Sequence, residues 1–587
     1  MASKTGNSFI DNLGRIYGLF TGGFLLFVVV LAILEQLGLA PKIIGWVFLA
    51  ATIGLYALIG VISRTSDVAE YYVAGRRVPA VFNGMAVGSD WMSAASFIGM
   101  AGSLYALGYD GLAYIMGWTG GYVLVALFLA PYLRKFGQFT IPDFLGARYG
   151  GNVARAIGIV AAITASFTYV VAQIKGAGII TSRFLEIPIE YGTWVGVAGI
   201  LVCSMLGGMR AVTWTQVAQY IVLIIAYLVP IVWLSYRLTG VPIPQLMYGQ
   251  ALAEIAALEP VLGVTKPYAQ PFVQMSQANF IGLVFCLMIG TAALPHILMR
   301  FYTTPSVREA RVSVGWSLFC IFLLYFSAPA YAAFAKLEVY KHVIGQAIAN
   351  LPAWVTNWGN LGLITIKDDN GDGILQVAEL TLNPDAIVLA TPEIAGLPYV
   401  VAGLVAAGGL SAALSTADGL LLTISNALSH DLYYKMIDPS ATTTRRLMVA
   451  RTLLLIVAAI AAYVASTAPS GILVFVSWAF SIAGAAFFPA LVLGIFWPRA
   501  TKEGAIAGML VGFGLTLFYV LTTSGFMGLP KYMEPWFGIN SIAAGVFGIP
   551  AGFLTIIVVS LLTKAPDQEV QALIHSVRYP NLEPERA

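Results

Sequence analysis

Residues 411–418 combine small and hydroxyl side chains in a way that suits cation binding. On a helix, Ala412, Ser415 and Thr416 occupy positions i, i+3 and i+4, so they share one face. Two hydroxyls and one carbonyl group supply hard oxygen ligands, which small hard cations prefer. Such hydroxyls can instead bond only to the preceding helical turn, but the nearby carboxylate of Asp418 favours a cation site.

A second polar segment, residues 88–96, contains Asp90 together with Ser89 and Ser93 inside an apolar stretch. An ionisable group within a membrane-spanning stretch is energetically costly and therefore indicates a function. Small polar residues also allow a helix to break, which frees carbonyl groups to bind a cation and amide groups to face an anion. The alternative is an unbroken helix whose small residues pack closely against a neighbour. The acid and the serines favour a break.

A second break is expected near Thr291. Gly290 and Pro295 lie on either side of this residue within an apolar stretch, and both residue types interrupt helices. His296 follows directly and could sense protons, although we expect it to have a structural role.

Lys175 is a lysine inside a further apolar stretch. Its ammonium group could neutralise a substrate carboxylate, or pair with Asp90 or Asp418. Alternatively, its long side chain could extend to the membrane surface and have no chemical role.

Residues 368–379 match the twelve-residue pattern D-x-[DN]-x-[DN]-G-x5-E of calcium-binding loops. The alternative is an acidic Asn-Gly turn. Outside a cell, such a loop is expected to bind calcium weakly, with a dissociation constant of about 10⁻⁴ to 10⁻³ M, and to order its surroundings. The predicted ligands are side chains and one carbonyl group: Asp368, Asn370, Asp372, the Ile374 carbonyl, Gln376 and Glu379.

The composition of the whole chain indicates a membrane protein. Of the 587 residues, 59% are hydrophobic and only 10% are charged, against about 25% charged residues in a soluble domain. The mean hydropathy of +0.84 requires many segments that face lipid. The net charge of +3 is too small to indicate nucleic-acid binding, and the three cysteines give no disulfide framework. No nucleophile–base pair or phosphate loop is evident, so we do not expect an enzyme.

About fourteen apolar stretches are long enough to cross a bilayer as helices. If the N-terminus lies inside, the inside loops and termini, with Arg300 among them, hold about three times as many Lys and Arg residues as the outside loops. This bias predicts that both termini are cytoplasmic. The expected spans are 17–39, 43–63, 78–107, 111–133, 156–181, 191–208, 212–236, 276–300, 312–338, 395–428, 448–468, 471–497, 504–525 and 541–563.

Several segments together resemble the sodium:solute symporter family over residues 43–563, and are closest to its cation/acetate branch. The family resemblance is carried by residues 67–76, 88–96, 207–216, 412–418 and 429–433. The resemblance to the acetate branch is carried by residues 93–97, 108–112, 294–301 and 308–311. An additional N-terminal span and the intramembrane lysine depart from the family pattern.

The resemblance implies an all-α polytopic fold with a LeuT-like core of five plus five helices in an inverted repeat. Two N-terminal helices with their loop would occupy residues 1–77. The first repeat would occupy 78–238, followed by an outside loop over 239–275. The second repeat would occupy 276–497, with a second outside loop over 339–394. Two C-terminal helices over 498–563 and a cytoplasmic tail over 564–587 would complete the chain.

The resemblance also implies the ligands of a sodium site and the place of the solute. Backbone oxygens of Gly88, Trp91 and Ala412 and the hydroxyls of Ser415 and Thr416 would hold sodium. The solute would lie beside this site, near the two breaks and residues from a third helix. The residues expected in solute binding or coupling are Ser89, Asp90, Ser93, Gln173, Lys175, Thr291 and Asp418.

The expected function is secondary active symport in a bacterial cytoplasmic membrane, with inward sodium flux driving uptake of acetate or another short monocarboxylate. Sodium is the expected transported ion, and a calcium ion in the outside loop is a further expectation. The expected partners are the small carboxylate and the lipid bilayer, with no obligatory protein partner. Coupling to protons, a different solute such as proline, and a transporter-like sensor are the alternatives.

Overall fold

The computed structural model describes residues 9–65, 67–137, 139–204, 208–468, 470–525 and 530–579. Gly207, the side chain of Cys203 and the two chain ends, residues 1–8 and 580–587, lie outside these described residues.

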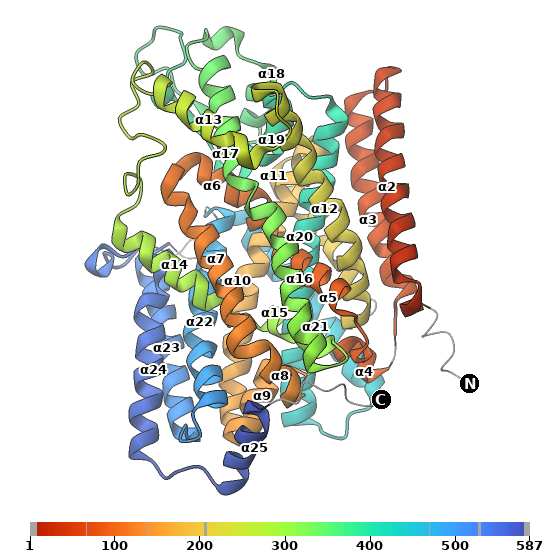
Figure 1. The fold of residues 1–587 in the computed structure, drawn as a ribbon, viewed down its shortest axis with the longest axis vertical. Coiled ribbons are helices and arrows are strands. Elements are labelled where there is room, and N and C mark those ends of the chain that lie inside the picture. Colours follow the sequence, from red (N-terminus) through yellow and green to blue (C-terminus); the bar gives the residue numbers. More distant parts are fainter. Residues whose placement is uncertain are drawn as a thin grey trace.

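Helices make up most of the described chain, and many of the long helices run along the long axis of the molecule (Figure 1). Their apolar side chains form one large buried core. In the first half of the chain, the α-helices are α2 (Leu13–Gln36), α3 (Pro41–Ile62), α4 (Val68–Val73), α5 (Ala80–Trp91), α6 (Met100–Leu107), α7 (Leu112–Leu124), α8 (Ala130–Phe136), α9 (Ile141–Tyr149), α10 (Asn152–Leu185), α11 (Ile189–Ser204), α12 (Gly208–Thr239) and α13 (Pro244–Leu258).

The second half of the chain is also helical, apart from one short hairpin. The strands β1 (Ile364–Ile366) and β2 (Leu380–Leu382) pair in antiparallel fashion, with Ile364 opposite Leu382. The α-helices are α14 (Gln277–Thr291), α15 (Pro295–Met299), α16 (Val307–Tyr325), α17 (Ala328–His342), α18 (Ala353–Gly359), α19 (Ile387–Ile394), α20 (Tyr399–Asn426), α21 (Thr443–Thr467), α22 (Ile472–Phe496), α23 (Lys502–Thr523), α24 (Gly545–Leu562) and α25 (Gln568–Arg578).

Twelve helical stretches among the described residues are long and apolar enough to cross a membrane, so the chain is a polytopic membrane protein. The expected number of fourteen is not confirmed. The predicted spans 78–107 and 111–133 correspond to α5 with α6 and to α7 with α8. The backbone leaves the helix at Gly108, with φ 56° and ψ −127°, and the short helix η3 (Gly108–Gly111) separates α6 from α7. The helix α5 alone has only 12 residues, fewer than a full crossing needs. The predicted span 191–208 corresponds to α11, of which the structure describes 16 residues up to the undescribed segment 205–207.

Both predicted breaks are present. The first separates α5 from the π-helical turn η2 (Ala95–Gly99), and the second separates α14 from α15. The backbone at Met92 leaves the helical region, with φ −75° and ψ 67°. At the second break, Leu294 is extended and Pro295 begins the new helix, where its missing N–H group costs nothing.

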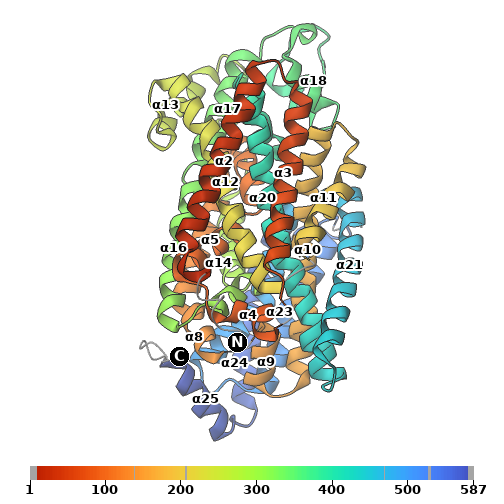
Figure 2. The ribbon, with the colours of Figure 1, turned by 90° about the vertical axis from the view of Figure 1, so that its right-hand side faces the viewer.

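The two long loops lie together at one end of the molecule. Figures 1 and 2 show α13 and α18 at the upper end, whereas α4, α9 and α25 lie at the lower end, near the beginning of α2. This arrangement agrees with the predicted placement of both long loops on one side of the membrane.

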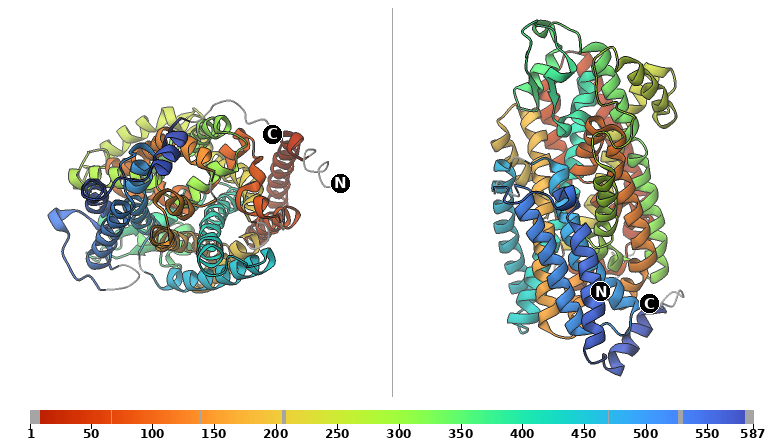
Figure 3. Two further views of the ribbon diagram at one scale, coloured as in Figure 1. Left: turned by 90° about the horizontal axis from the view of Figure 1, so that it is seen from below. Right: turned by 90° about the vertical axis from the view of Figure 1, so that its left-hand side faces the viewer.

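The N-terminal helix α2 lies at the rim of the bundle beside α3, as the view along the long axis shows (Figure 3). Its surface is largely exposed, as expected for a helix that faces lipid. Two polar contacts attach it to the core. The Tyr17 hydroxyl donates to the Trp214 carbonyl at 2.8 Å, and the Glu35 carboxylate accepts from the backbone N–H groups of Tyr399 and Val400 at 2.7 and 2.8 Å. Glu35 thus caps the beginning of α20.

Candidate functional site

The hydroxyl face of α20 lies directly against the break after α5. The Ser415 hydroxyl donates to the Ser89 carbonyl at 2.8 Å and to the Ala412 carbonyl at 3.0 Å. The Thr416 hydroxyl donates to the Asp90 carbonyl at 2.8 Å. All these residues are buried. The structure therefore brings the hydroxyl helix and the broken helix together, as the sequence predicts.

The carbonyl groups that accept hydrogen bonds from the two hydroxyls belong to Ser89 and Asp90, and not to the expected Gly88 and Trp91. The carbonyls of Gly88 and Trp91 instead accept from the N–H groups of Met92 and Ser93, each at 2.8 Å. A carbonyl oxygen has two lone pairs, so Gly88 keeps one acceptor position besides this bond, whereas the Trp91 carbonyl also accepts from the Ser96 hydroxyl at 3.4 Å. Gly88 and Trp91 are both buried, but Gly88 faces Cys320 and Tyr220, and the Trp91 ring lies against Tyr122 and Phe480.

Gln173 of α10 holds the chain at the first break. Its side-chain oxygen accepts from the Ala94 N–H at 2.9 Å, and the Ser93 hydroxyl oxygen accepts from the Ala95 N–H at 3.2 Å. These bonds satisfy amide groups at the start of the second half-helix, which an interrupted helix leaves without intrahelical partners. Gln173 and Ser93 therefore lie at the break, where the sequence analysis placed the solute.

Asp90 forms a buried ion pair with Arg300. The Arg300 Nε lies 3.0 Å from the Asp90 Oδ2, and the two side chains are 1% and 0% exposed. The assignment of Arg300 to an inside loop is wrong, because the chain after α15 turns into the core as the short helix η5 (Arg300–Thr303). Asp418 is also buried, and the neighbouring Gly419 abuts the Asp90 carboxylate.

Lys175 lies at a different place from these acids. Its ammonium group donates to the carbonyls of Ala468 and Ser470 at 2.9 and 2.5 Å, directly after the end of α21. A cation at the C-terminal end of a helix is stabilised by the helix dipole and by the last carbonyl groups. Arg300, and not Lys175, is the cation that the structure pairs with Asp90.

Thr291 is the last residue of α14, at the second break. Its hydroxyl donates to the Leu287 carbonyl of the preceding turn at 2.6 Å, and its side chain packs against Gly121 of α7. The hydroxyl thus makes the local bond that threonine commonly makes within a helix.

An aromatic cluster around Phe480 of α22 joins the two breaks, and no pattern in the sequence predicts it. Ring centroids of Trp91, Trp118 and Tyr169 lie 5.7, 6.1 and 5.6 Å from that of Phe480. His296, beyond the second break, lies 5.6 Å from Tyr169. Because these rings come from five different helical segments, no spacing in the sequence connects them.

Four neutral polar side chains in or beside this cluster have buried nitrogen atoms without a hydrogen-bond partner among the described residues. They are the Gln173 Nε2, the Trp91 Nε1, the Trp118 Nε1 and both ring nitrogens of His296. A buried polar group without a partner is costly, and such groups commonly serve a ligand. N–H donors of this kind, next to aromatic rings, suit a small solute that has both an anionic and an apolar part.

Comparison with models of known protein families identifies the family of this chain. The model of the sodium:solute symporter family matches residues 71–352 and 376–512. The chain belongs to the sodium:solute symporter family. This family consists of transporters, which agrees with the absence of an enzymatic motif in the sequence. The matched ranges leave out residues 353–375, where most of the calcium-type pattern lies.

Two curated relatives cover almost the whole of this symporter. A protein of Cupriavidus necator, described as an uncharacterised symporter, is 47% identical over 96% of this chain and 98% of its own. A monocarboxylic acid transporter of Corynebacterium glutamicum is 27% identical over 91% of this chain and 93% of its own.

A solved structure shares the fold of this symporter. The substrate-bound, outward-open state of a Na⁺-coupled sialic acid symporter aligns with a TM-score of 0.67, covering 89% of this chain and 99% of that chain. Sequence identity is 18%, so the likeness concerns the fold alone.

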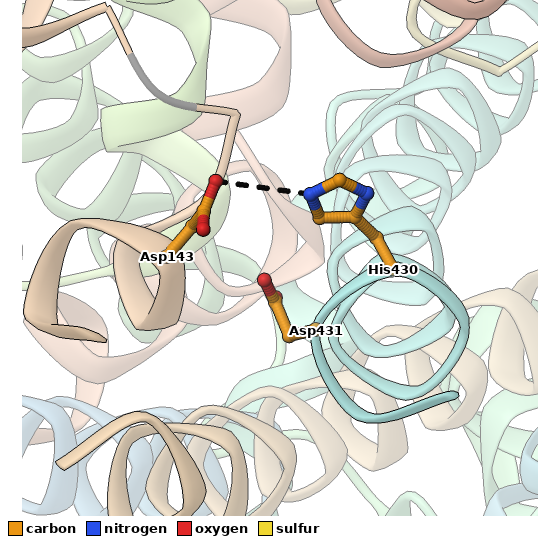
Figure 4. A group of neighbouring side chains, drawn as sticks. All are labelled: Asp143, His430 and Asp431. Atoms are coloured by element: carbon orange, nitrogen blue, oxygen red, sulfur yellow. Dashed lines mark ion pairs between the residues drawn. The ribbon is translucent and has the colours of Figure 1, made fainter. Parts of the chain in front are cut away.

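One further group of side chains in the symporter has the composition of a metal site. Among the described residues, Asp143, His430 and Asp431 bring their ligand atoms within 4.8 Å of one another (Figure 4). However, the guanidinium group of Arg446 lies 3.2 Å from the His430 Nδ1. Arginine can only donate, so Nδ1 accepts, and the proton of the neutral ring is on Nε2, the atom that faces Asp143. This leaves no imidazole lone pair for a metal ion.

The same cluster connects α9 to the helical segment η9 (Ala427–Ile437), which directly follows α20. The His430 Nε2 lies 3.7 Å from the Asp143 Oδ2, and the Thr140 hydroxyl contacts both Asp431 oxygens at 2.9 and 2.8 Å. Burial alone would raise the pKa of Asp143, but the polar contact with the His430 N–H and the nearby cations Lys435 and Arg155 hold that pKa below its ordinary value. We interpret the cluster as a structural connection.

The predicted calcium loop has the backbone turns of its pattern but no converged set of ligands. Asp368 accepts from the N–H groups of Gly371 and Gly373 at 2.9 and 3.1 Å, and Glu379 accepts from those of Asp369 and Gln376 at 3.2 and 3.0 Å.

Amide groups likewise surround the central acid of the loop. Asp372 accepts from Asn370, Gln376 and the Ile374 N–H. The strands β1 and β2 flank the loop in place of two helices. Calcium binding therefore stays a prediction without support from the structure or the relatives.

Proposed function

We propose that the protein is a secondary active symporter that couples inward sodium flux to uptake of a small monocarboxylate such as acetate. The observation that supports sodium coupling best is the contact between the Ser415 and Thr416 hydroxyls and the carbonyls of the broken helix. In the proposed sodium-bound state, these hydroxyls turn their lone pairs to the ion. Backbone oxygens of Gly88, Trp91 and Ala412 complete the oxygen shell that replaces its water.

The proposed solute site lies beside the sodium site, between the two breaks. Gln173, Trp118 and His296 offer neutral polar groups that are buried, and the rings around Phe480 would surround the apolar part of a small solute. The similarity to a monocarboxylic acid transporter supports a monocarboxylate. Sodium entry would drive uptake, since each positive charge gains about 2.3 kcal/mol per 100 mV of inside-negative potential.

The proposed membrane arrangement places α13 and α18 outside a bacterial cytoplasmic membrane, and α9 and α25 inside. The distribution of Lys and Arg supports this orientation. Both long loops lie at the end of the molecule that is proposed to face outward (Figure 1).

Uptake of labelled acetate by proteoliposomes tests the proposal. We expect an inward sodium gradient at constant pH to accelerate uptake, and an inside-negative potential to accelerate it further. Uptake that follows a proton gradient and ignores sodium would instead support proton coupling, for which the buried carboxylates Asp90 and Asp418 are the candidates. Sodium-driven uptake of proline, with no competition by acetate, would contradict the proposed solute.

A further inference from the structure

We propose that Arg300 is a positioning residue for the cation site and that it acts through Asp90. This inference rests on the proposed sodium coupling. The side chain of Asp90 pairs with the Arg300 Nε at 3.0 Å, while the backbone carbonyl of the same residue accepts the Thr416 hydroxyl at 2.8 Å. One residue therefore joins the arginine to the face that would hold the ion.

Arg300 is itself held firmly by its surroundings. Its Nη1 lies 3.1 Å from the Thr213 hydroxyl and 3.1 Å from the Met209 sulfur, both on α12. Its side chain is only 1% exposed, so water cannot replace these contacts. The guanidinium group is a rigid fork, which fixes the direction of each hydrogen bond that it donates.

The Asp90 carboxylate is also confined on its other side. A Cβ atom at Gly419 of α20 would lie 2.3 Å from the Asp90 Oδ1, so the carboxylate rests against the backbone of the hydroxyl helix. Gly419 follows Thr416 by three residues, which places it one turn further along the same helix. Arg300 and Gly419 together fix where the Asp90 side chain lies, and hence where its carbonyl group points.

The ion pair also connects the two interrupted helices of the fold. Asp90 belongs to the last turn of α5, before the first break, and Arg300 follows α15, after the second break. Removal of one partner would leave a buried charge without compensation. We therefore expect the pair to hold both half-helices in the geometry in which the cation binds.

Sodium dependence of uptake, measured in proteoliposomes, tests the inference with Arg300→Lys and Gly419→Ala. Arg300→Lys keeps the positive charge but loses the forked guanidinium group. Gly419→Ala displaces the Asp90 carboxylate but keeps its charge. For each, we expect the sodium concentration for half-maximal uptake to rise about tenfold, the scale of one lost charge-assisted hydrogen bond. The solute KM at saturating sodium should stay within about twofold, because the solute groups are untouched.

The matched control is Arg183→Lys, which alters another largely buried arginine pair, with Glu393 at 2.8 Å, far from the break. It should leave both constants unchanged. Unchanged sodium dependence in Gly419→Ala, or equal shifts of both constants in Arg300→Lys, would overturn the inference while the proposed function stands. If Arg300→Lys does not fold, Gly419→Ala alone decides. Wild-type uptake that is indifferent to sodium would remove the proposed function and the inference with it.

Discussion

Single side chains in this protein act through backbone groups. The Ser415 and Thr416 hydroxyls and the Gln173 amide all contact main-chain atoms of the first break. Backbone carbonyls are strong oxygen ligands, and an interrupted helix exposes them without a side-chain carboxylate. Substitutions at this scale should therefore separate ion binding from solute binding.

Ser415→Ala and Thr416→Ala should each raise the sodium concentration for half-maximal uptake about tenfold or more, because each removes one oxygen ligand from a buried site. Sodium titrations of uptake at fixed acetate provide the measurement. Ser411→Ala is the matched control, because its hydroxyl lies on the same helix and contacts Tyr56 and Ala407 instead. Equal sodium dependence in all three variants would exclude the hydroxyl face as the cation site.

Trp118→Phe should raise the solute KM about fivefold, because the ring stays while the indole N–H donor is lost. The sodium requirement should not change, since Trp118 contacts neither hydroxyl of α20. Competition curves with acetate and propionate would give the measurement. Trp233→Phe, at an exposed position on α12, serves as the control. A normal KM in Trp118→Phe would remove this donor from the proposed solute site.

Elements outside the predicted repeats also support the site. Near its end, α2 carries Glu35, whose carboxylate caps α20, the helix with the proposed cation face. This contact gives a structural role to an N-terminal span that the resemblance left without one.

Glu35→Ala should reduce the free energy of unfolding by about 1 kcal/mol, the usual effect of a lost helix cap. The thermal melting point of the purified protein would show this loss as a decrease. Glu534→Ala, which removes an exposed acid that lies outside the helices, should leave the melting point unchanged, because an exposed ion pair such as the one it makes with Lys531 contributes little. Identical melting curves for the two variants would contradict the capping role.

Calcium binding by the loop can be measured by calorimetry of the purified protein. We expect a dissociation constant of about 10⁻⁴ to 10⁻³ M, loss of the signal in Asp372→Ala, and partial retention of acetate uptake in that variant. Asp369→Ala changes an acid of the same loop that is not a predicted ligand, and it should keep the signal. A wild-type protein without a calcium signal would end this hypothesis.

At the scale of the whole molecule, a buried polar centre lies between two opposite ends of the helix bundle. The described residues place the long loops at one end and α4, α9 and α25 at the other (Figure 1). The fold agrees with that of a sodium-coupled symporter structure. The proposed orientation places the long loops outside the membrane.

Accessibility of single cysteines to a membrane-impermeant maleimide in intact cells tests that orientation. In a cysteine-free background, Lys266→Cys should react from outside, and Lys502→Cys should react only after the membrane is opened. Both native lysines are exposed in the structure. The reverse pattern would invert the proposed topology.

The sequence alone determined the properties that depend on local composition. The lengths of the apolar stretches predicted most of the membrane spans. Small polar residues, together with Gly and Pro, predicted both helix breaks. The i, i+3, i+4 spacing placed Ser415 and Thr416 on one face, since helical periodicity fixes which residues point the same way.

Only the tertiary structure decided which distant groups meet. It paired Asp90 with Arg300 instead of Lys175, shifted the accepting carbonyls to Ser89 and Asp90, and gathered rings around Phe480. These outcomes depend on contacts between separate helices, and the approach of two helices is set by packing over their whole surfaces, which no local pattern contains.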